Sequence, residues 1–149
     1  MSAQPIPAPD QPVLHEVPFM LAYGDCDPAG IVYYPVLYHY CHVAFEEAWR
    51  GALGIAYPEL VANWRLGFPT VHVETDFVSP ARYGDAVVVD VSVLEVGTTS
   101  VVFRFEGRVG DRVVLQSKQT TVCLDLDEFV KRPIPLEIRD ALARLVPVA

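Results

Sequence analysis

Two carboxylates near the N-terminus stand where the sequence predicts a loop before a helix. Asp25 and Asp27 lie in the run D-C-D-P-A-G, which ends at Gly30, and Pro35 then opens a segment with helical spacing. Proline suits the first turn of a helix, because the N–H that it lacks has no intrahelical partner there. The other N–H groups of that turn are unpaired and carry a partial positive charge. A carboxylate beside such donors suits attack on a carbonyl group, with the donors holding the oxyanion.

The spacing of apolar residues predicts the elements that position this loop. Leu14 to Tyr23 is typical of a strand, and Pro35 to Leu53 of a helix that is apolar on most sides and therefore buried. Shorter helices are expected over Tyr57 to Trp64 and Leu136 to Leu145. Segments rich in β-branched residues, separated by Gly, Pro and Asp turns, predict four more strands over Phe68–Phe77, Ala86–Val96, Ser100–Val109 and Arg112–Leu126.

The order of these elements predicts the architecture. Short turns between the consecutive strands indicate an antiparallel meander. One sheet needs one apolar cover, which the buried helix supplies. We therefore expect an α+β fold, with an antiparallel sheet wrapped around a long central helix. Residues 13–149 are expected to form a single domain, and residues 1–12, which carry four prolines and no periodicity, a disordered tail.

Composition narrows the class of function. The net charge of −8 argues against binding to nucleic acid or to an anionic membrane. No apolar run approaches the roughly 18 residues that span a bilayer, and the N-terminus lacks the features of a signal peptide, so we expect a cytoplasmic protein. Three cysteines without a C-x-x-C pair predict free thiols and no zinc site. Cys26 stands between two acids, which disfavour its thiolate, so we do not expect it to be a nucleophile.

The run from Tyr23 to Pro35, Y-G-D-C-D-P-A-G-I-V-Y-Y-P, closely resembles the signature of the 4-hydroxybenzoyl-CoA thioesterase family, a group of hotdog-fold acyl-CoA thioesterases. Two weaker likenesses support it: residues 80–85 resemble the family's P-A-R-x-x-D turn, and Gly67-Phe68-Pro69 resembles its G-x-P. The resemblance covers roughly Val17 to Leu126. It implies a hotdog fold and hydrolysis of an acyl-CoA thioester to a free acid and coenzyme A, with no metal or organic cofactor.

The resemblance also implies roles for individual residues. Asp27 matches the catalytic carboxylate, as nucleophile or general base, and the backbone N–H of Tyr34 matches the amide that polarises the thioester carbonyl. Family members are dimers or tetramers that hold the acyl group between subunits. The central helix and the segment from Gly67 to Thr70 are therefore expected to meet from two chains. The residues implied to contact the substrate are Tyr33, His42, Gly67, Phe68, Pro69 and Thr70.

The sequence departs from the family pattern in two places. His42 stands where hydroxybenzoyl-specific enzymes carry an acid that contacts the substrate hydroxyl, which argues against 4-hydroxybenzoate itself. A lone histidine on an apolar helix is also commonly an interior residue, and His39 three residues earlier does not complete a metal site. Some relatives carry basic residues for the coenzyme A phosphates at the turn over residues 97–100, which is uncharged here.

Other polar residues admit structural interpretations. Asp25 is expected to accept hydrogen bonds from backbone N–H groups of the loop. Arg82 and Asp85 are expected to stabilise a turn, with a phosphate contact from Arg82 as a minor alternative. His72 and Glu74 share one face of a strand, either toward solvent or as a polar pair in the cleft.

Three rival functions stay open beside hydrolysis of an acyl-CoA. One is a non-catalytic acyl-CoA-binding module. Another is an acyl-carrier-protein thioesterase, although the acidic net charge would repel an acidic carrier. A third is a hydratase on the same fold, which needs a differently placed His–Asp pair. A serine esterase is disfavoured because no G-x-S-x-G motif occurs.

Overall fold

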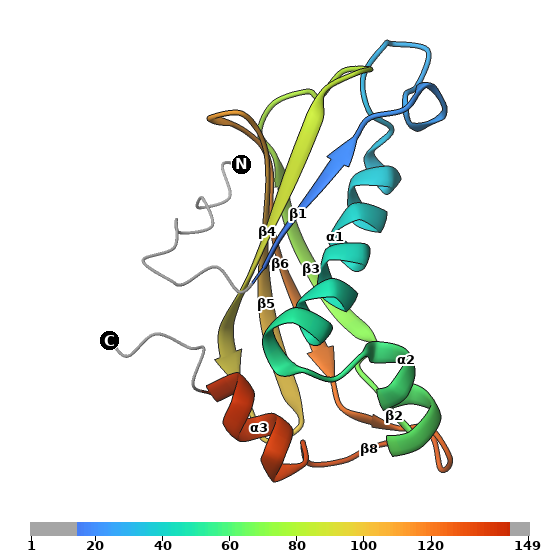
Figure 1. Cartoon of the computed structure of the whole chain (residues 1–149), viewed down its shortest axis with the longest axis vertical. Coiled ribbons are helices and arrows are strands. Elements are labelled where there is room, and N and C mark those ends of the chain that lie inside the picture. Colours follow the sequence, from blue (N-terminus) through green and yellow to red (C-terminus); the bar gives the residue numbers. More distant parts are fainter. Residues whose placement is uncertain (1–14, 144–149) are drawn as a thin grey trace.

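A curved antiparallel sheet with one long helix against it forms the body of the protein, in a computed structural model that describes residues 15–143 (Figure 1). The helix α1 spans Tyr34–Ala48. The sheet order is β1-β4-β5-β6-β3. These strands are β1 (His15–Met20), β3 (Thr70–Phe77), β4 (Ala86–Val96), β5 (Ser100–Val109) and β6 (Arg112–Val122). The α+β prediction is confirmed, whereas the expected tail over residues 1–12 lies outside the described residues.

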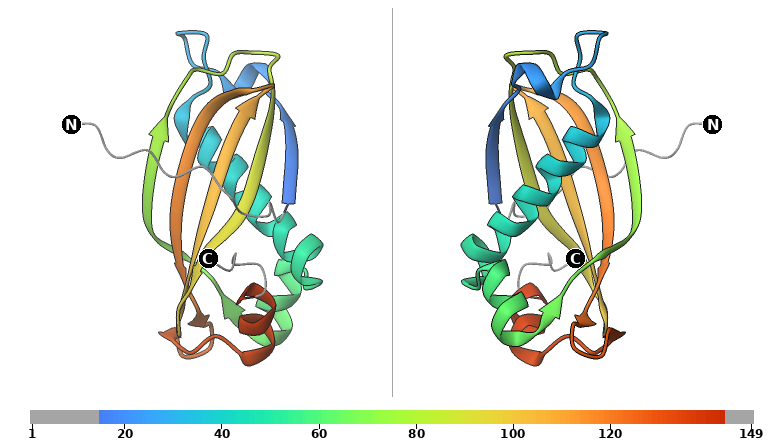
Figure 2. Two further views of the ribbon diagram at one scale, coloured as in Figure 1. Left: turned by 90° about the vertical axis from the view of Figure 1, so that its left-hand side faces the viewer. Right: turned by 90° about the vertical axis from the view of Figure 1, so that its right-hand side faces the viewer.

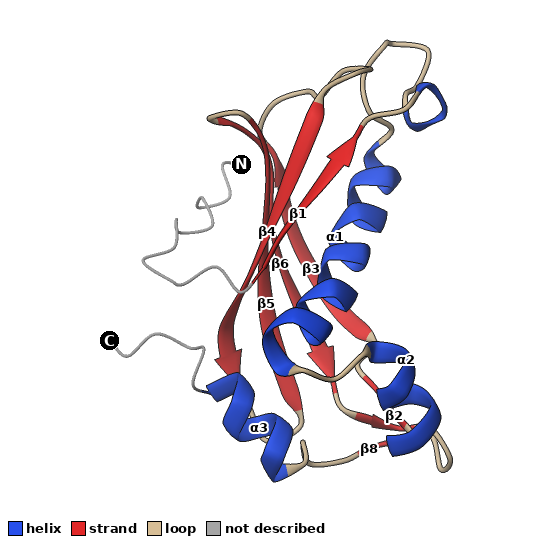
Figure 3. Ribbon diagram, viewed as in Figure 1, coloured by secondary structure: helices blue, strands red, loops and turns tan. Residues whose placement is uncertain are grey.

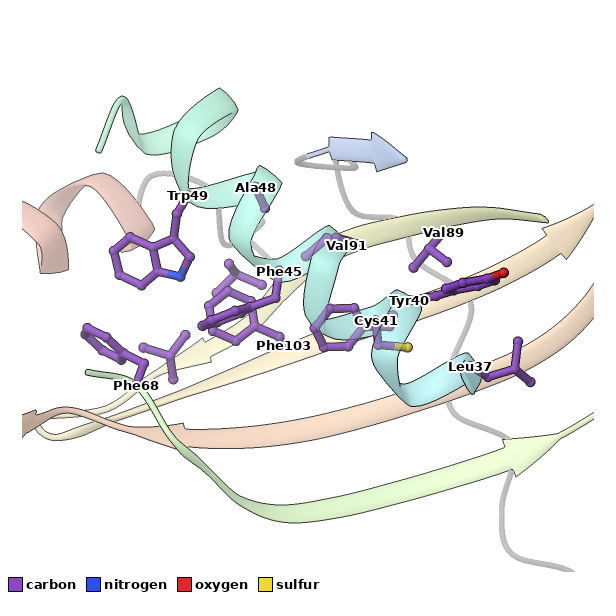
Figure 4. Packing of buried hydrophobic residues seen from close by; sticks show 14 of the residues in the cluster. Leu37, Tyr40, Cys41, Phe45, Ala48, Trp49, Phe68, Val89, Val91 and Phe103 are labelled. Carbon is purple, nitrogen blue, oxygen red and sulfur yellow. The ribbon is translucent and has the colours of Figure 1, made fainter. Parts of the chain in front are cut away.

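The sheet curves around α1, as the two side views in Figure 2 show. Apolar residues at intervals of three and four give α1 a buried side. Alternate residues of β4 and β5 face the helix, because side chains of a strand alternate between the two faces of its sheet. The close-up in Figure 4 shows this packing. The contributing residues include Leu37, Tyr40, Cys41, Ala44 and Phe45 of α1, and Val87, Val89, Val91, Val101, Phe103 and Phe105 of the sheet.

The expected meander is confirmed for β4, β5 and β6 and is wrong for β3. Strand β3 pairs with β6, not with β4, so the chain between Phe77 and Ala86 crosses from one side of the sheet to the other. The Ser79-Pro80 break allows this crossing, because proline cannot donate a ladder hydrogen bond. Strand β1 pairs with β4 instead. The crossing matters for the site because it brings residues 81–85 next to the loop that carries Asp27.

Shorter elements close the end of the sheet away from that loop, coloured by type in Figure 3. Beyond Ala48 the chain continues into a π-helical turn, Trp49–Leu53, which ends at Gly54 with a φ of 71°. The expected second helix appears as α2 (Tyr57–Glu59) and a π-helical turn, Leu60–Trp64. A small second sheet joins β2 (Leu66–Gly67), β7 (Leu124–Asp125) and β8 (Val130–Lys131). The last helix, α3, spans Leu136–Ala143, and residues 144 and 145 of its expected range lie outside the described residues.

The side of α1 that faces away from the sheet is open, which corrects the expectation of burial on most sides. Tyr34 is 56% exposed, and His39 and His42 are exposed as well. Strand β3 is a sheet edge whose residues are largely exposed, so no described element covers α1 on that flank. The fold therefore presents one helix face and one strand edge together.

Candidate active site

The loop that carries Asp27 is a tight turn closed by its own backbone. The N–H of Asp27 donates to the carbonyl of Ile31 at 2.9 Å, and its carbonyl accepts from the N–H of Gly30 at 2.9 Å. Gly30 has a φ of 82°, a conformation that residues with a side chain rarely adopt. Oδ1 of Asp27 accepts the N–H of Ala29 at 2.9 Å, and Oδ2 has no partner among the described residues. The turn thus fixes the carboxylate and leaves one oxygen available.

The start of α1 offers one unpaired amide beside this turn. The N–H of Tyr33 donates to the carbonyl of Asp25 at 2.9 Å, and the N–H of Val36 donates to the carbonyl of Tyr33 at 2.9 Å. Pro35 has no N–H. Within the described residues, the N–H of Tyr34 is therefore the first-turn donor without a partner. It combines a free N–H with the positive end of the helix dipole, the combination that stabilises an oxyanion.

Asp25 holds the loop, as the sequence predicted. Its Oδ2 accepts the N–H of Ala22 at 2.9 Å and the phenol O–H of Tyr40 at 2.8 Å. The first bond is the expected one to the loop backbone. The second, to α1, was not predicted, because Asp25 and Tyr40 are fifteen residues apart in the sequence.

Asp27 and Tyr34 line two different pockets, and each pocket also includes other residues of the loop between them. A pocket of about 520 Å³ has Asp27 in its wall, and its lining is Tyr23, Cys26, Asp27, Pro28, Gly30 and Tyr83. A second pocket, of about 430 Å³, is lined by Ile31, Val32, Tyr34, Leu37, Phe77, Val78, Ser79 and Pro80. The first is rimmed by aromatic and polar groups, and the second is largely apolar. A thioester whose carbonyl lies at the loop would have these two pockets available for its two arms.

His42 lies on the open side of α1, so the interpretation of His42 as an interior residue is wrong. Its side chain is 57% exposed and pairs with Glu46 at 3.3 Å. It lines a pocket of about 300 Å³ between the helix and β3, together with Tyr38, Thr70, Val73 and Gln119. The pocket places His42 where it can contact a bound group, which keeps the substrate contact as a hypothesis.

The segment from Gly67 to Thr70 divides between core and pocket. Phe68 is 2% exposed and packs on Trp49, with ring centroids 4.9 Å apart, so its side chain belongs to the core of this chain. Gly67 is also buried, and a Cβ there would lie 3.2 Å from the side chain of Leu126. Pro69 is exposed, and Thr70 lines the pocket of His42. Among these four predicted substrate contacts, Thr70 lines one of the three pockets described here, and the other three residues line none of these pockets.

An aromatic row joins the Tyr34 pocket to the His42 pocket. Phe77 of β3 makes edge-on contacts with the rings of Tyr34 and Tyr38, each with centroids 5.9 Å apart. Tyr33, predicted as a substrate contact, is exposed and meets Tyr34 edge-on at 5.7 Å. Tyr34, Tyr38 and His42 are spaced four residues apart, which places them on one helix face. The contributions of Phe77, Val73 and Gln119 were missed because they depend on the position of β3.

The remaining predicted polar pairs are structural. The N–H of Arg82 donates to Oδ2 of Asp85 at 2.8 Å, which confirms the turn. His72 and Glu74 pair at 3.1 Å with both side chains more than half exposed, so the interpretation as a solvent face is confirmed. All three cysteines are free thiols. Within residues 15–143, His, Cys, Asp and Glu do not gather in any group of three that could hold a metal ion.

The uncharged turn over residues 97–99 has a cation beside it that the sequence did not indicate. The guanidinium of Arg139, from α3, donates to the carbonyl of Gly97. Because these residues are 42 positions apart in the sequence, the contact could not be predicted from local spacing.

As for membranes, the described helices are all too short or too polar to cross one.

The model of the thioesterase superfamily matches residues 29–116 of this chain, which is more than half of its length. The chain belongs to the thioesterase superfamily. The match begins two residues after Asp27. A 1,4-dihydroxy-2-naphthoyl-CoA hydrolase from Nostoc punctiforme is 30% identical over 116 residues, which cover 78% of each chain.

Solved structures support the same assignment. A thioesterase superfamily protein from Jannaschia sp. CCS1 is 26% identical, with a TM-score of 0.88 over 96% of this chain and 99% of its own. A gentisyl-coenzyme A thioesterase is 27% identical, with a TM-score of 0.76 over 84% of this chain and 99% of its own. The hotdog fold and the activity predicted from the sequence are confirmed: this superfamily member is an acyl-CoA thioester hydrolase.

Proposed function

We propose that this thioesterase hydrolyses hydroxyaryl-CoA thioesters, such as 1,4-dihydroxy-2-naphthoyl-CoA, with Asp27 as the catalytic carboxylate. The observation that carries the proposal is the loop geometry: Oδ2 of Asp27 and the N–H of Tyr34 are both unpaired among the described residues. One is a base or nucleophile, and the other is an oxyanion donor. The relatives that act on hydroxynaphthoyl and gentisyl thioesters support the choice of acyl group.

Asp27 can break the thioester by either of two routes. As a nucleophile, its carboxylate attacks the carbonyl carbon and the C–S bond breaks, which gives a mixed anhydride that water then hydrolyses. As a general base, it takes a proton from water, which attacks the carbonyl carbon directly. In both routes the sulfur leaves as thiolate and is protonated, water supplies the new oxygen, and the N–H of Tyr34 holds the carbonyl oxygen as it gains charge.

The aromatic row on the open face of α1 suits an aryl acyl group. Rings of Tyr34, Tyr38 and Phe77 offer edges and faces to a planar substrate. At the far end of that row, His42 and Gln119 supply polar atoms in the wall of one pocket. Ring hydroxyls of a dihydroxynaphthoyl group can hydrogen-bond to such atoms, whereas a plain alkyl chain would leave them unpaired.

The chain is expected to work as a dimer or tetramer. Strand β3 is a sheet edge with exposed apolar side chains at Val71, Val73 and Phe77. Unpaired edges of this kind are templates for pairing with another strand. Two of the three pockets described above have β3 residues in their walls, so a second copy on this edge would enclose the acyl sites.

A thiol-release assay across matched substrates tests this function. The panel contains 1,4-dihydroxy-2-naphthoyl-CoA, 4-hydroxybenzoyl-CoA, benzoyl-CoA, an alkyl acyl-CoA of medium length and an acyl-carrier-protein thioester. An enzyme-only control is required, because the thiol of Cys26 is partly exposed. We expect the highest kcat/KM for the dihydroxynaphthoyl substrate. Release of thiol from none of them would contradict a hydrolase, and a preference for the alkyl substrate would contradict the aryl assignment.

A further inference from the structure

Two exposed tyrosine rings stand at the mouth of the pocket that Asp27 lines. Tyr23 is 84% exposed and Tyr83 is 64% exposed, and their rings meet edge-on with centroids 6.0 Å apart. Both contribute to the wall of the 520 Å³ pocket. Large rings left in solvent mark binding surfaces, and an aromatic face stacks well with a nucleic acid base.

Tyr83 and Arg82 are held against the catalytic loop by backbone contacts. Arg82 forms a β-bridge with Ile31, and the N–H of Val32 donates to the carbonyl of Ala81 at 2.8 Å. The N–H of Arg82 is bound by Asp85, so the base of its side chain is fixed within the turn. The positions of Arg82 and Tyr83 relative to Asp27 are therefore set by the fold.

Arg82 is distinguished by its lack of an ionic partner. Six arginines of the described chain pair with carboxylates: Arg50, Arg65, Arg104, Arg108, Arg112 and Arg132. Four cations form no ion pair with a described residue. Lys118 lies across from Glu74 in the sheet, and Lys131 and Arg139 lie on β8 and α3, at the end of the molecule opposite the catalytic loop (Figure 1). Among these four cations, Arg82 is the one whose backbone pairs with the loop that carries Asp27, and it stands next to Tyr83 in the sequence, at the edge of the Asp27 pocket and outside its lining residues.

We propose that Arg82, Tyr83 and Tyr23 bind the nucleotide part of coenzyme A, with the base on the tyrosines and a phosphate at Arg82. This inference rests on the proposed function, because it places the coenzyme A arm in the Asp27 pocket and the acyl arm in the apolar pocket of Tyr34. A chain of net charge −8 repels a polyanionic substrate, so a local unpaired cation at the site matters more than the overall field.

Comparing coenzyme A with pantetheine isolates the contribution of this site to binding, because pantetheine lacks the nucleotide. The variants are Arg82→Gln and Tyr83→Leu. The controls are Arg50→Gln, an exposed arginine in the π-helical turn after α1 that pairs with Glu47, and Arg139→Gln, the rival cation. Binding of coenzyme A is measured by calorimetry, and KM is compared for an acyl-CoA and the pantetheine thioester of the same acid. Melting temperatures check folding.

We expect Arg82→Gln to weaken coenzyme A binding and to raise KM for the acyl-CoA roughly three- to tenfold, as for a lost charge-assisted hydrogen bond at an exposed site. Tyr83→Leu should weaken coenzyme A binding and raise KM for the acyl-CoA by about fivefold, the lower range for stacking of one base. Neither should change KM for the pantetheine thioester. Salt should shrink the Arg82 effect.

The proposal is overturned if Arg82→Gln binds coenzyme A as tightly as the parent protein does, or if Arg139→Gln causes the loss of binding instead. It is also overturned if Arg82→Gln raises KM equally for the acyl-CoA and for the pantetheine thioester. Coenzyme A is the product of the proposed reaction, so its binding can be measured whether or not the protein hydrolyses a thioester. A chain that binds coenzyme A through Arg82 and releases no thiol would therefore refute the proposed hydrolysis while keeping the nucleotide site.

Discussion

Tyr40 of α1 donates a hydrogen bond to Oδ2 of Asp25 at 2.8 Å, so the buried side of the helix holds the loop that presents Asp27. Tyr40 is 7% exposed, and its ring stacks on Phe19 of β1 at 4.2 Å. Burial, followed by the hydrogen bond to Asp25, raises the pKa of Tyr40 well above its ordinary value, so the phenol remains a donor at neutral pH. Strand, loop and helix are thereby joined at one point.

Tyr40→Phe removes this bond and keeps the ring. We expect kcat to fall by roughly ten- to a hundredfold, the scale of a misplaced catalytic group, because Asp27 is no longer held relative to the Tyr34 amide. KM should change little, since Tyr40 lines none of the three described pockets. Steady-state kinetics measure the split.

Gln116→Met is the matched control for Tyr40→Phe. It removes the hydrogen bond from Gln116 to Glu106, at 3.1 Å, in another part-buried position of the sheet. Both variants should lower the melting temperature slightly. If both lower kcat to the same extent, Tyr40 acts only through stability and the positioning role is wrong.

His42→Leu tests the acyl end of the aromatic row. We expect kcat/KM for 1,4-dihydroxy-2-naphthoyl-CoA to fall about tenfold, the scale of one lost hydrogen bond to a charged or polar partner, while benzoyl-CoA is unaffected. His39→Leu is the control, because His39 is an exposed histidine on the same helix that does not line this pocket. Equal losses of kcat/KM for the two substrates would show that His42 does not determine acyl specificity.

The exposed edge of strand β3 leads us to predict that copies of the chain pair along it. Val71→Lys places a charge on an exposed apolar position of this edge, and we expect dissociation to monomers with loss of activity. Met20→Lys makes the same change on β1, the other edge of the sheet, where Met20 is also exposed. Sedimentation velocity distinguishes them. Dissociation caused by Met20→Lys and not by Val71→Lys would place the interface on β1 and contradict the assignment to β3.

Cys41 predicts a loss of stability in alkali. Burial raises the pKa of its thiol from 9.0 to about 12 in the folded protein. The folded state therefore keeps a proton that the unfolded chain loses above pH 9. This contribution is complete below pH 9 and decreases between pH 9 and 12, by about 1.4 kcal/mol per pH unit. Denaturant titrations should show a shallower alkaline loss for Cys41→Ala, and parallel curves would contradict the burial of this thiol.

Local sequence patterns were enough to predict the turn that carries Asp27 and most elements. Pro35 and Gly54 mark the ends of the central helical segment in both prediction and structure, because their backbone preferences act locally. The D-C-D-P-A-G run likewise predicted a turn before a helix. Contacts within a few residues depend little on the rest of the fold.

The errors arose where pairing between distant segments decides exposure. The exposed state of His42 follows from the position of β3 at the sheet edge, beside β6, which no turn motif specifies. The packing of Phe68 on Trp49 in the core likewise depends on distant segments, and its predicted contact with the substrate stays a prediction. The bond between Asp25 and Tyr40 required the loop to fold back on the helix, so spacing alone could not show it.

Asp27→Asn tests the central claim most directly. Asparagine keeps an oxygen that can accept the N–H of Ala29, so the turn should persist while the negative charge is lost. Asp25→Asn, in the same loop, is the control for loss of a charge, because the amide oxygen of asparagine can still accept the bonds from Ala22 and Tyr40. On the best acyl-CoA we expect kcat of Asp27→Asn to fall by about three orders of magnitude or more with the melting temperature preserved, as for a lost nucleophile or base. Turnover near that of the parent protein would contradict a catalytic role for Asp27.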